Sequence, residues 1–161
     1  MPSVPRFYWD ANIFLSYINN EAARAPNIEA LLGRAERGEI EILTSTITIA
    51  EVAFAAAEQQ GHALDPAIEQ KIAALWGPPI KLVEFHAAIG SRAAGLIRTA
   101  VANAWSLTPL DAVHLSSAQQ MTVDAFHTYD GGLAKYAPLV GFPIVEPPTA
   151  QVQGNLFGGP P

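Results

Sequence analysis

The sequence contains no cysteine among its 161 residues. Disulfide bonds and zinc sites built from thiolates are therefore excluded. No apolar run reaches the roughly 18 residues that a membrane-spanning helix needs. The first residues, MPSVPRFYWD, also lack the basic and then apolar stretches of a secretory signal. We therefore expect a cytoplasmic protein that does not bind a membrane.

Charged residues are scarce, at 15% of the sequence, and positive residues are the rarer kind. The formal net charge is −6. Proteins that hold nucleic acid by charge alone are usually basic, so this class is disfavoured. Half of the residues are hydrophobic, a composition that is typical of a globular domain rather than of a disordered chain.

Strand patterns alternate with helical patterns along the chain, which predicts parallel strands joined by helical crossovers. We therefore expect a three-layer α/β/α sandwich around a central, mainly parallel sheet. The domain is predicted to span residues 1–146, followed by a Pro/Gly-rich, disordered tail at 147–161. The predicted strands cover residues 6–9, 39–44, 80–85, 125–129 and 143–146; the main helices cover 26–38, 48–60, 65–76, 86–105 and 108–120.

Acidic residues recur where the strands of this sheet end. Asp10 directly follows the first strand, and Asp130 follows the strand AFHTY. Glu51 is predicted in the first turn of the helix after the second strand, and Asp111 in the first turn of the helix that begins near residue 108. Ligands bind at the carboxyl ends of the strands in parallel α/β sheets. The four acids are therefore candidates for one shared site.

Each of these acids also has a local explanation. Glu51 and Asp111 stand three residues after a Thr, the spacing of a helix capping box. Asp130 precedes a Gly, as in a tight turn, and Asp10 is placed to cap a helix. Because independent caps need not gather at one edge of a sheet, the four acids together favour the shared site.

Four segments resemble, in the same order, the sequence motifs of the PIN domain family. YWDANIFLSYI ends an aromatic strand in Asp-x-Asn, and TSTITIAEV places a Glu at the start of a helix. LTPLDAVHLSSA carries an Asp-Ala pair in an apolar helix, and VDAFHTYDGGLAKYA ends a strand in Thr-x-Asp. The resemblance covers about residues 4–146. The subgroup that the chain resembles most is the VapC-type toxins of bacterial and archaeal toxin–antitoxin pairs.

The resemblance implies a ribonuclease that depends on Mg²⁺ or Mn²⁺ and cuts single-stranded RNA. It also implies a homodimer and, for a toxin, a cognate antitoxin protein. The polar positions that support the metal site in the family match Asn12 and Thr128. Carried over residue by residue, the catalytic and metal-binding acids of the family fall on Asp10, Glu51, Asp111 and Asp130.

The chemistry of such a cluster follows from its charge. Two carboxylates about 4 Å apart repel by roughly 4 kcal/mol at an effective dielectric constant near 20. A hard cation such as Mg²⁺ removes this conflict, and oxygen ligands prefer it. It also lowers the pKa of a bound water, which then attacks a phosphodiester. Three further residues are weaker candidates for RNA contact, with solvated or structural roles as the alternative: Arg92, Arg98 and His114.

Three other functions remain open at this stage. A phosphatase with Asp10 as covalent nucleophile is disfavoured, because residue 12 is Asn where such enzymes carry Asp. A solitary PIN nuclease in RNA processing would have the same motifs as a toxin. A PIN module that binds RNA or protein without cleavage is disfavoured because all four acids are present.

Overall fold

The structure, a computed structural model, describes residues 2–61 and 65–150. It has a central sheet of five strands in the order β3-β2-β1-β4-β5, and all neighbouring strands are parallel. This confirms the predicted fold class. The strands are β1 (Arg6–Trp9), β2 (Glu41–Ser45), β3 (Ile80–Val83), β4 (Ala125–His127) and β5 (Ile144–Val145).

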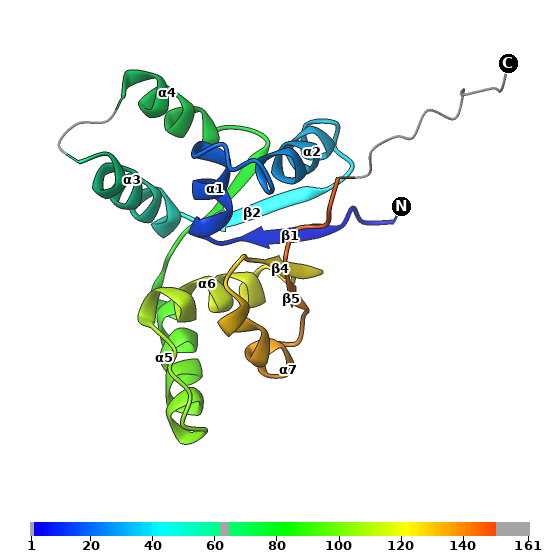
Figure 1. Cartoon of the computed structure of the whole chain (residues 1–161). Helices are drawn as coiled ribbons and strands as arrows, with labels where there is room; N and C mark the ends of the chain where they lie inside the picture. The colour runs from blue at the N-terminus through cyan, green and yellow to red at the C-terminus, as the bar shows by residue number, and fades with distance from the viewer. Residues whose placement is uncertain (1, 62–64, 151–161) are drawn as a thin grey trace, which may run out of the picture.

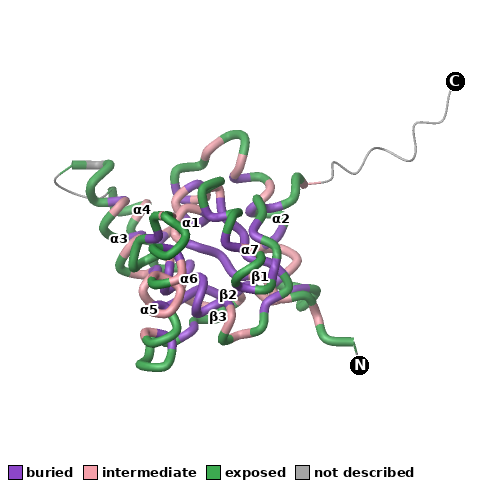
Figure 2. Tube along the Cα trace, turned by 90° about the horizontal axis from the view of Figure 1, so that it is seen from below, coloured by how far each residue is buried: buried purple, intermediate pink, exposed green. Residues whose placement is uncertain are grey.

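Helices cover both faces of the sheet and complete the three layers (Figure 1). One face packs against α1 (Ala11–Ile18), α2 (Ala25–Glu36), α3 (Ile47–Gln60) and α4 (Pro66–Leu75). The other face packs against α5 (Ala87–Ala102), α6 (Pro109–Gln120), the 3₁₀ helix η1 (Gly131–Tyr136) and α7 (Ala137–Val140). Two hydrophobic cores result, one on each side of the sheet. Figure 2 shows the buried residues concentrated at the centre.

Two local predictions need correction. Thr48 was predicted to begin a helix and to form a capping box with Glu51. Both predictions are wrong, because α3 begins at Ile47 and Thr48 lies within it. The Thr48 hydroxyl instead pairs with the hydroxyl of Thr44, 2.7 Å away in the core. Glu51 therefore lies in the second turn of α3 rather than the first. The helix α1 was anticipated only as a cap at Asp10, which occupies the N-cap position but whose side chain makes no capping hydrogen bond.

Other helix starts agree with the sequence. Asp65 accepts a hydrogen bond from the Ala67 amide and begins α4. Thr108 Oγ1 accepts one from the Asp111 amide at 3.2 Å and begins α6. Residues 112–118 of α6 are all buried, so this helix is anchored along its length and holds its first turn in a fixed place.

The packed part of the chain extends slightly beyond the predicted domain end. Pro147 is buried, and the Ala150 amide donates to Asn27 Oδ1 at 2.8 Å. The beginning of the predicted tail therefore lies against α2. The remainder of that tail, 151–161, is outside the described residues. None of the helices in the described part is long and apolar enough to cross a membrane.

Candidate functional site

The pairing of β1 with β4 brings two sequence-distant segments to one edge of the sheet. Trp9 at the end of β1 lies opposite His127 at the end of β4. The next residues, Asp10 and Thr128, therefore leave the sheet side by side. This is the carboxyl edge, where parallel α/β proteins bind their ligands.

Asn12 joins these two strand ends. Its Nδ2 group donates to Asp10 Oδ2 at 3.3 Å and to Thr128 Oγ1 at 3.1 Å. Its Oδ1 atom accepts from the Tyr129 amide at 3.0 Å. Thr128 Oγ1 in turn accepts from the Asp130 amide at 3.0 Å. Asn12 and Thr128 thus hold the backbone that carries the two acids.

Asp10 is the most constrained acid of the group. It is only 5% exposed, and its Oδ1 atom has no hydrogen-bond partner among the described residues. Burial raises the pKa of Asp10 to about 7, and the nearby charge of Asp111 adds to the rise. A buried oxygen without a partner is uncommon in native proteins. A proton or a cation at Oδ1 would satisfy it.

Asp111 lies at the electrostatic centre of the acids. Burial raises its pKa, and the charges of Asp130 and Glu51 raise it further, while the Thr108 hydroxyl opposes them. Since Asp111 also acts on Asp10, the four predicted acids share one neighbourhood. Like charges held this close disfavour full ionisation unless a positive charge joins them.

Asp130 is the exposed member of the group. Its Oδ1 accepts a hydrogen bond from the Gly132 amide at 2.9 Å, so the predicted tight turn is present as well. A Cβ atom at position 132 would stand 3.1 Å from that oxygen, so a larger residue there would require the Asp130 carboxylate to shift. Only one carboxylate oxygen of Asp130 is used by the turn, and the other accepts no hydrogen bond within residues 2–61 and 65–150.

Glu51 is held in place by a chain of hydrogen bonds to buried side chains. Its Oε1 lies 2.6 Å from His114 Nε2, and His114 Nδ1 lies 2.7 Å from the Tyr8 hydroxyl. His114 is 2% exposed. Such burial leaves little surface for contact with RNA and agrees with the structural alternative for this residue. Sequence reasoning missed Tyr8, because an aromatic residue in a strand indicates only a core position.

Carboxylates near one edge of a sheet are candidate ligands for a divalent cation. In the part of the chain that the structure describes, no three His, Asp or Glu side chains are arranged to hold a metal ion as they stand. The donor chemistry nevertheless fits a hard cation. All four acids offer oxygen. Among the described residues, none of the four pairs with a Lys or Arg, and Asp10 Oδ1 has no hydrogen-bond partner.

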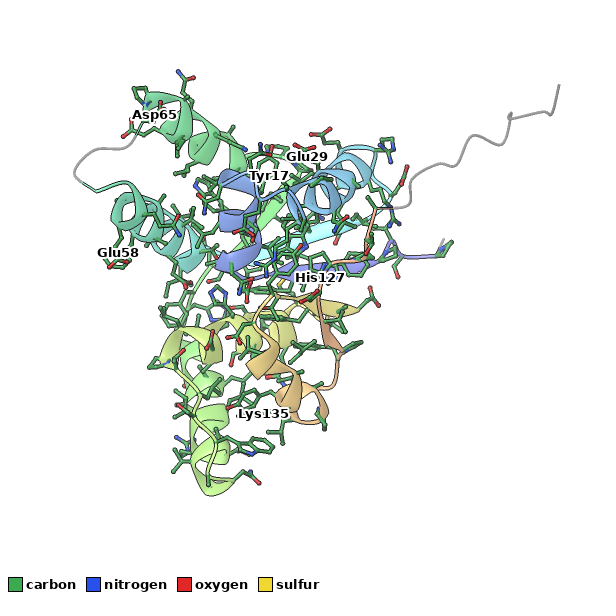
Figure 3. The ribbon with its side chains drawn as sticks, in the orientation of Figure 1. Tyr17, Glu29, Glu58, Asp65, His127 and Lys135 are labelled. Atoms are coloured by element: carbon green, nitrogen blue, oxygen red, sulfur yellow. The ribbon has the colours of Figure 1, made fainter. Side chains whose placement is uncertain are left out.

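Positive side chains without an acidic partner lie mainly on the α5 side of the sheet. Arg92 and Arg98 are exposed on α5 and form no ion pair with a described residue. Lys135 of η1 lies on the same side (Figure 3), with its Nζ 5.7 Å from the ring centre of Trp105. Lys71 is the remaining cation of this kind and lies on α4. By contrast, Figure 3 shows Glu58 and Asp65 away from the sheet, on the α3 and α4 side.

Comparisons with known proteins agree with this architecture. The family model of the PIN domain matches residues 7–139. No curated protein matches the chain. Among solved structures, VapBC2 from Rickettsia felis, bound to a DNA fragment from its promoter, superposes with a TM-score of 0.65 at 15% identity over 86% of this chain and 96% of that one.

Two further structures are similar. VapC20 from Mycobacterium tuberculosis, a toxin that cleaves the sarcin–ricin loop, gives a TM-score of 0.62 at 14% identity over 78% of this chain and 90% of that one. FitAcB from Neisseria gonorrhoeae gives 0.61 at 18% identity over 88% and 97%. At such low identities the likeness concerns the fold.

Proposed function

Because the chain belongs to the PIN domain family, we propose that it is an endoribonuclease that needs Mg²⁺ or Mn²⁺ and hydrolyses RNA phosphodiester bonds. The observation that carries the proposal is Asp10. It is a buried acid with an unpartnered oxygen and a raised pKa, and it lies in the field of Asp111. A site that only stabilised the fold would have no reason to keep such a group.

The residues have distinct parts in this proposal. Asp10, Asp111 and Asp130 would hold the cation directly, and Glu51 directly or through water. The cation supplies Lewis acidity, which lowers the pKa of water and offsets charge on the phosphate. Asn12 keeps the Asp10 carboxylate in place through Oδ2 and leaves Oδ1 open. Burial favours the protonated form of Asp10, and a bound cation would favour its carboxylate.

Substrate binding is assigned to the α5 side of the sheet. The net charge of −6 gives the protein no general attraction for RNA. Arg92 and Arg98 have no acidic partner among the described side chains, so their charges are available to phosphates. Each cation that contacts a phosphate adds a salt-dependent contribution to affinity.

We further propose that the chain is the toxin of a type II toxin–antitoxin pair. The similar structures from Rickettsia felis and Neisseria gonorrhoeae are VapBC2 and FitAcB. A cognate antitoxin and a homodimer follow from this proposal. Light scattering of the purified protein tests the dimer, and a small adjacent gene for a DNA-binding protein would separate a toxin from a solitary PIN nuclease.

Cleavage assays decide between the proposed nuclease and the two alternatives. Purified protein is incubated with a panel of single-stranded and structured RNAs in Mn²⁺, in Mg²⁺ and in chelator. We expect cuts that need the cation and disappear in Asp10→Asn. Binding of RNA without cuts in Mn²⁺ would instead support a non-catalytic module. A phosphoaspartate at Asp10 after treatment with a phosphomonoester would support the phosphatase.

A further inference from the structure

Glu51 differs from the other three acids because one of its oxygens is held by a buried histidine. His114 lies on α6, one turn beyond Asp111, and Glu51 lies on α3 across the end of β2. The distance of 2.6 Å between His114 Nε2 and Glu51 Oε1 is that of a short hydrogen bond to a charged group. No hydrogen bond reaches Oε2 from the part of the chain that the structure describes.

The direction of this hydrogen bond follows from the group on the other side of the ring. The Tyr8 hydroxyl accepts from the Ser45 amide at 3.0 Å. The hydroxyl has one proton to donate, and His114 Nδ1 lies 2.7 Å away to accept it. A neutral imidazole carries one N–H group and one acceptor nitrogen. With Nδ1 accepting, the proton of the ring is on Nε2 and points to Glu51.

We propose that His114 is a positioning residue for Glu51, and that Tyr8 sets the tautomer that lets His114 do so. A chain of donors then runs from the Ser45 amide at the end of β2, through Tyr8 and His114, to Glu51 Oε1. It fixes one oxygen of Glu51 and leaves Oε2 for the cation. This inference rests on the proposed function, in which Glu51 serves the cation.

The side chains packed around Tyr8 and His114 hold these hydrogen bonds in place. Tyr8 and His114 are 0% and 2% exposed. The Tyr8 ring stacks on Phe126 with centroids 5.1 Å apart, and His114 meets its edge at 5.7 Å. Partners that orient a metal ligand in this way commonly change metal affinity or activity by about 10- to 100-fold when they are removed.

Four variants test the proposal, with Mn²⁺ affinity measured by electron paramagnetic resonance. In His114→Leu the donor to Glu51 is lost, and we expect Mn²⁺ affinity to fall by about 10- to 100-fold. In His114→Gln a side-chain amide can donate in place of Nε2, and we expect most of the affinity to return. Tyr8→Phe keeps the ring and should weaken binding less. His127→Leu is the matched control, because His127 is equally buried at 2% but hydrogen-bonds to Trp9.

Nitrogen-15 spectra of the histidine rings give a readout that needs neither metal nor activity. We expect the Nε2–H tautomer of His114 in the wild type and a mixture of tautomers in Tyr8→Phe. An Nδ1–H tautomer in the wild type would overturn the proposal, even if His114→Leu fails to fold. So would a folded His114→Leu that binds Mn²⁺ like the wild type, or a His127→Leu that loses as much affinity. Wild-type protein that neither binds Mn²⁺ nor cleaves RNA would instead defeat the proposed function.

Discussion

The two ends of the sheet differ in whether their acidic side chains are paired with basic ones. At the amino end, Glu41 Oε2 accepts from Arg6 Nε at 2.8 Å, and Glu41 Oε1 accepts from Lys81 Nζ at 2.6 Å. Asp124 accepts from the Arg6 amide at 2.7 Å. At the carboxyl end, none of the four candidate acids has a Lys or Arg partner within the described part of the chain, and the buried Asp10 has an oxygen without a hydrogen-bond partner there.

The pKa directions record the same contrast. Lys81 and Arg6 hold the pKa of Glu41 below its usual range. Burial and neighbouring acids hold the pKa of Asp10 and of Asp111 above theirs. The acids at the amino end are therefore paired within the protein, whereas those at the carboxyl end form no ion pair with a described Lys or Arg. One sheet thus separates the residues that stabilise it from the residues that need a ligand.

The largest expected effect comes from neutralising the carboxyl end. Asp10→Asn should lower RNA cleavage by at least about 100-fold, a loss typical of a residue that stabilises transition-state charge. Without metal the same variant should unfold at a higher denaturant concentration, because it removes a buried acid that repels its neighbours. Cleavage rates and urea titrations check the two parts. Full activity in the folded variant would remove Asp10 from the site.

The second prediction concerns how the free energy of unfolding depends on pH through His127, at the carboxyl end of β4. Burial lowers its pKa from 6.5 to about 4. The unfolded chain therefore binds a proton at this residue at higher pH than the folded chain. Its contribution to stability is complete above pH 6.5 and falls as the pH drops toward 4, by roughly 3 kcal/mol. Urea titrations from pH 7 to pH 4 should show a shallower decline in His127→Phe; equal slopes would contradict the assignment.

A change at the amino end should alter stability alone. Glu41→Gln weakens the pairs with Arg6 and Lys81, which are partly exposed, and we expect a loss of about 1 kcal/mol in the free energy of unfolding. Cleavage and Mn²⁺ binding should stay at the wild-type level. A variant of Glu41 that folds well but cuts RNA slowly would break the separation of the two ends.

The smallest effect is expected from replacing the arginines of α5, Arg92 and Arg98. Arg98→Gln should raise the KM for RNA by only about 2- to 4-fold and reduce the slope of log affinity against log salt by about one. Arg92→Gln should act in the same direction. Arg37→Gln, which disturbs an exposed pair with Glu39, is the control that should leave the salt slope unchanged. Identical slopes in all three would place the RNA elsewhere.

The sequence was sufficient to predict the layers of the fold and the edge of the sheet near which the candidate acids lie. Asp10 and Asp130 were predicted together because parallel strands end at one edge of a sheet, whatever their separation along the chain. The helix α1 was underpredicted because it is only eight residues long and mostly apolar, and so short an apolar run does not distinguish a helix from a buried strand.

Side-chain pairing was harder to predict than strand order. The pattern Thr48-x-x-Glu51 has the spacing of a capping box, yet Thr48 bonds to Thr44 in the core. The hydrogen bonds that link Tyr8 to Glu51 join residues far apart in the sequence. Tyr8 and His114 are 106 positions apart, and His114 and Glu51 are 63 positions apart. Such contacts depend on how α6 and α3 pack against the sheet, and local sequence patterns do not contain that information.

The claim that the carboxyl end of the sheet needs a cation is tested most directly by calorimetric titration of the metal-free protein with Mn²⁺ at pH 7. The account predicts saturable binding to the wild type, release of protons on binding, and loss of both in folded Asp10→Asn. Absence of binding by well-folded wild-type protein, or unchanged binding by Asp10→Asn, would contradict it.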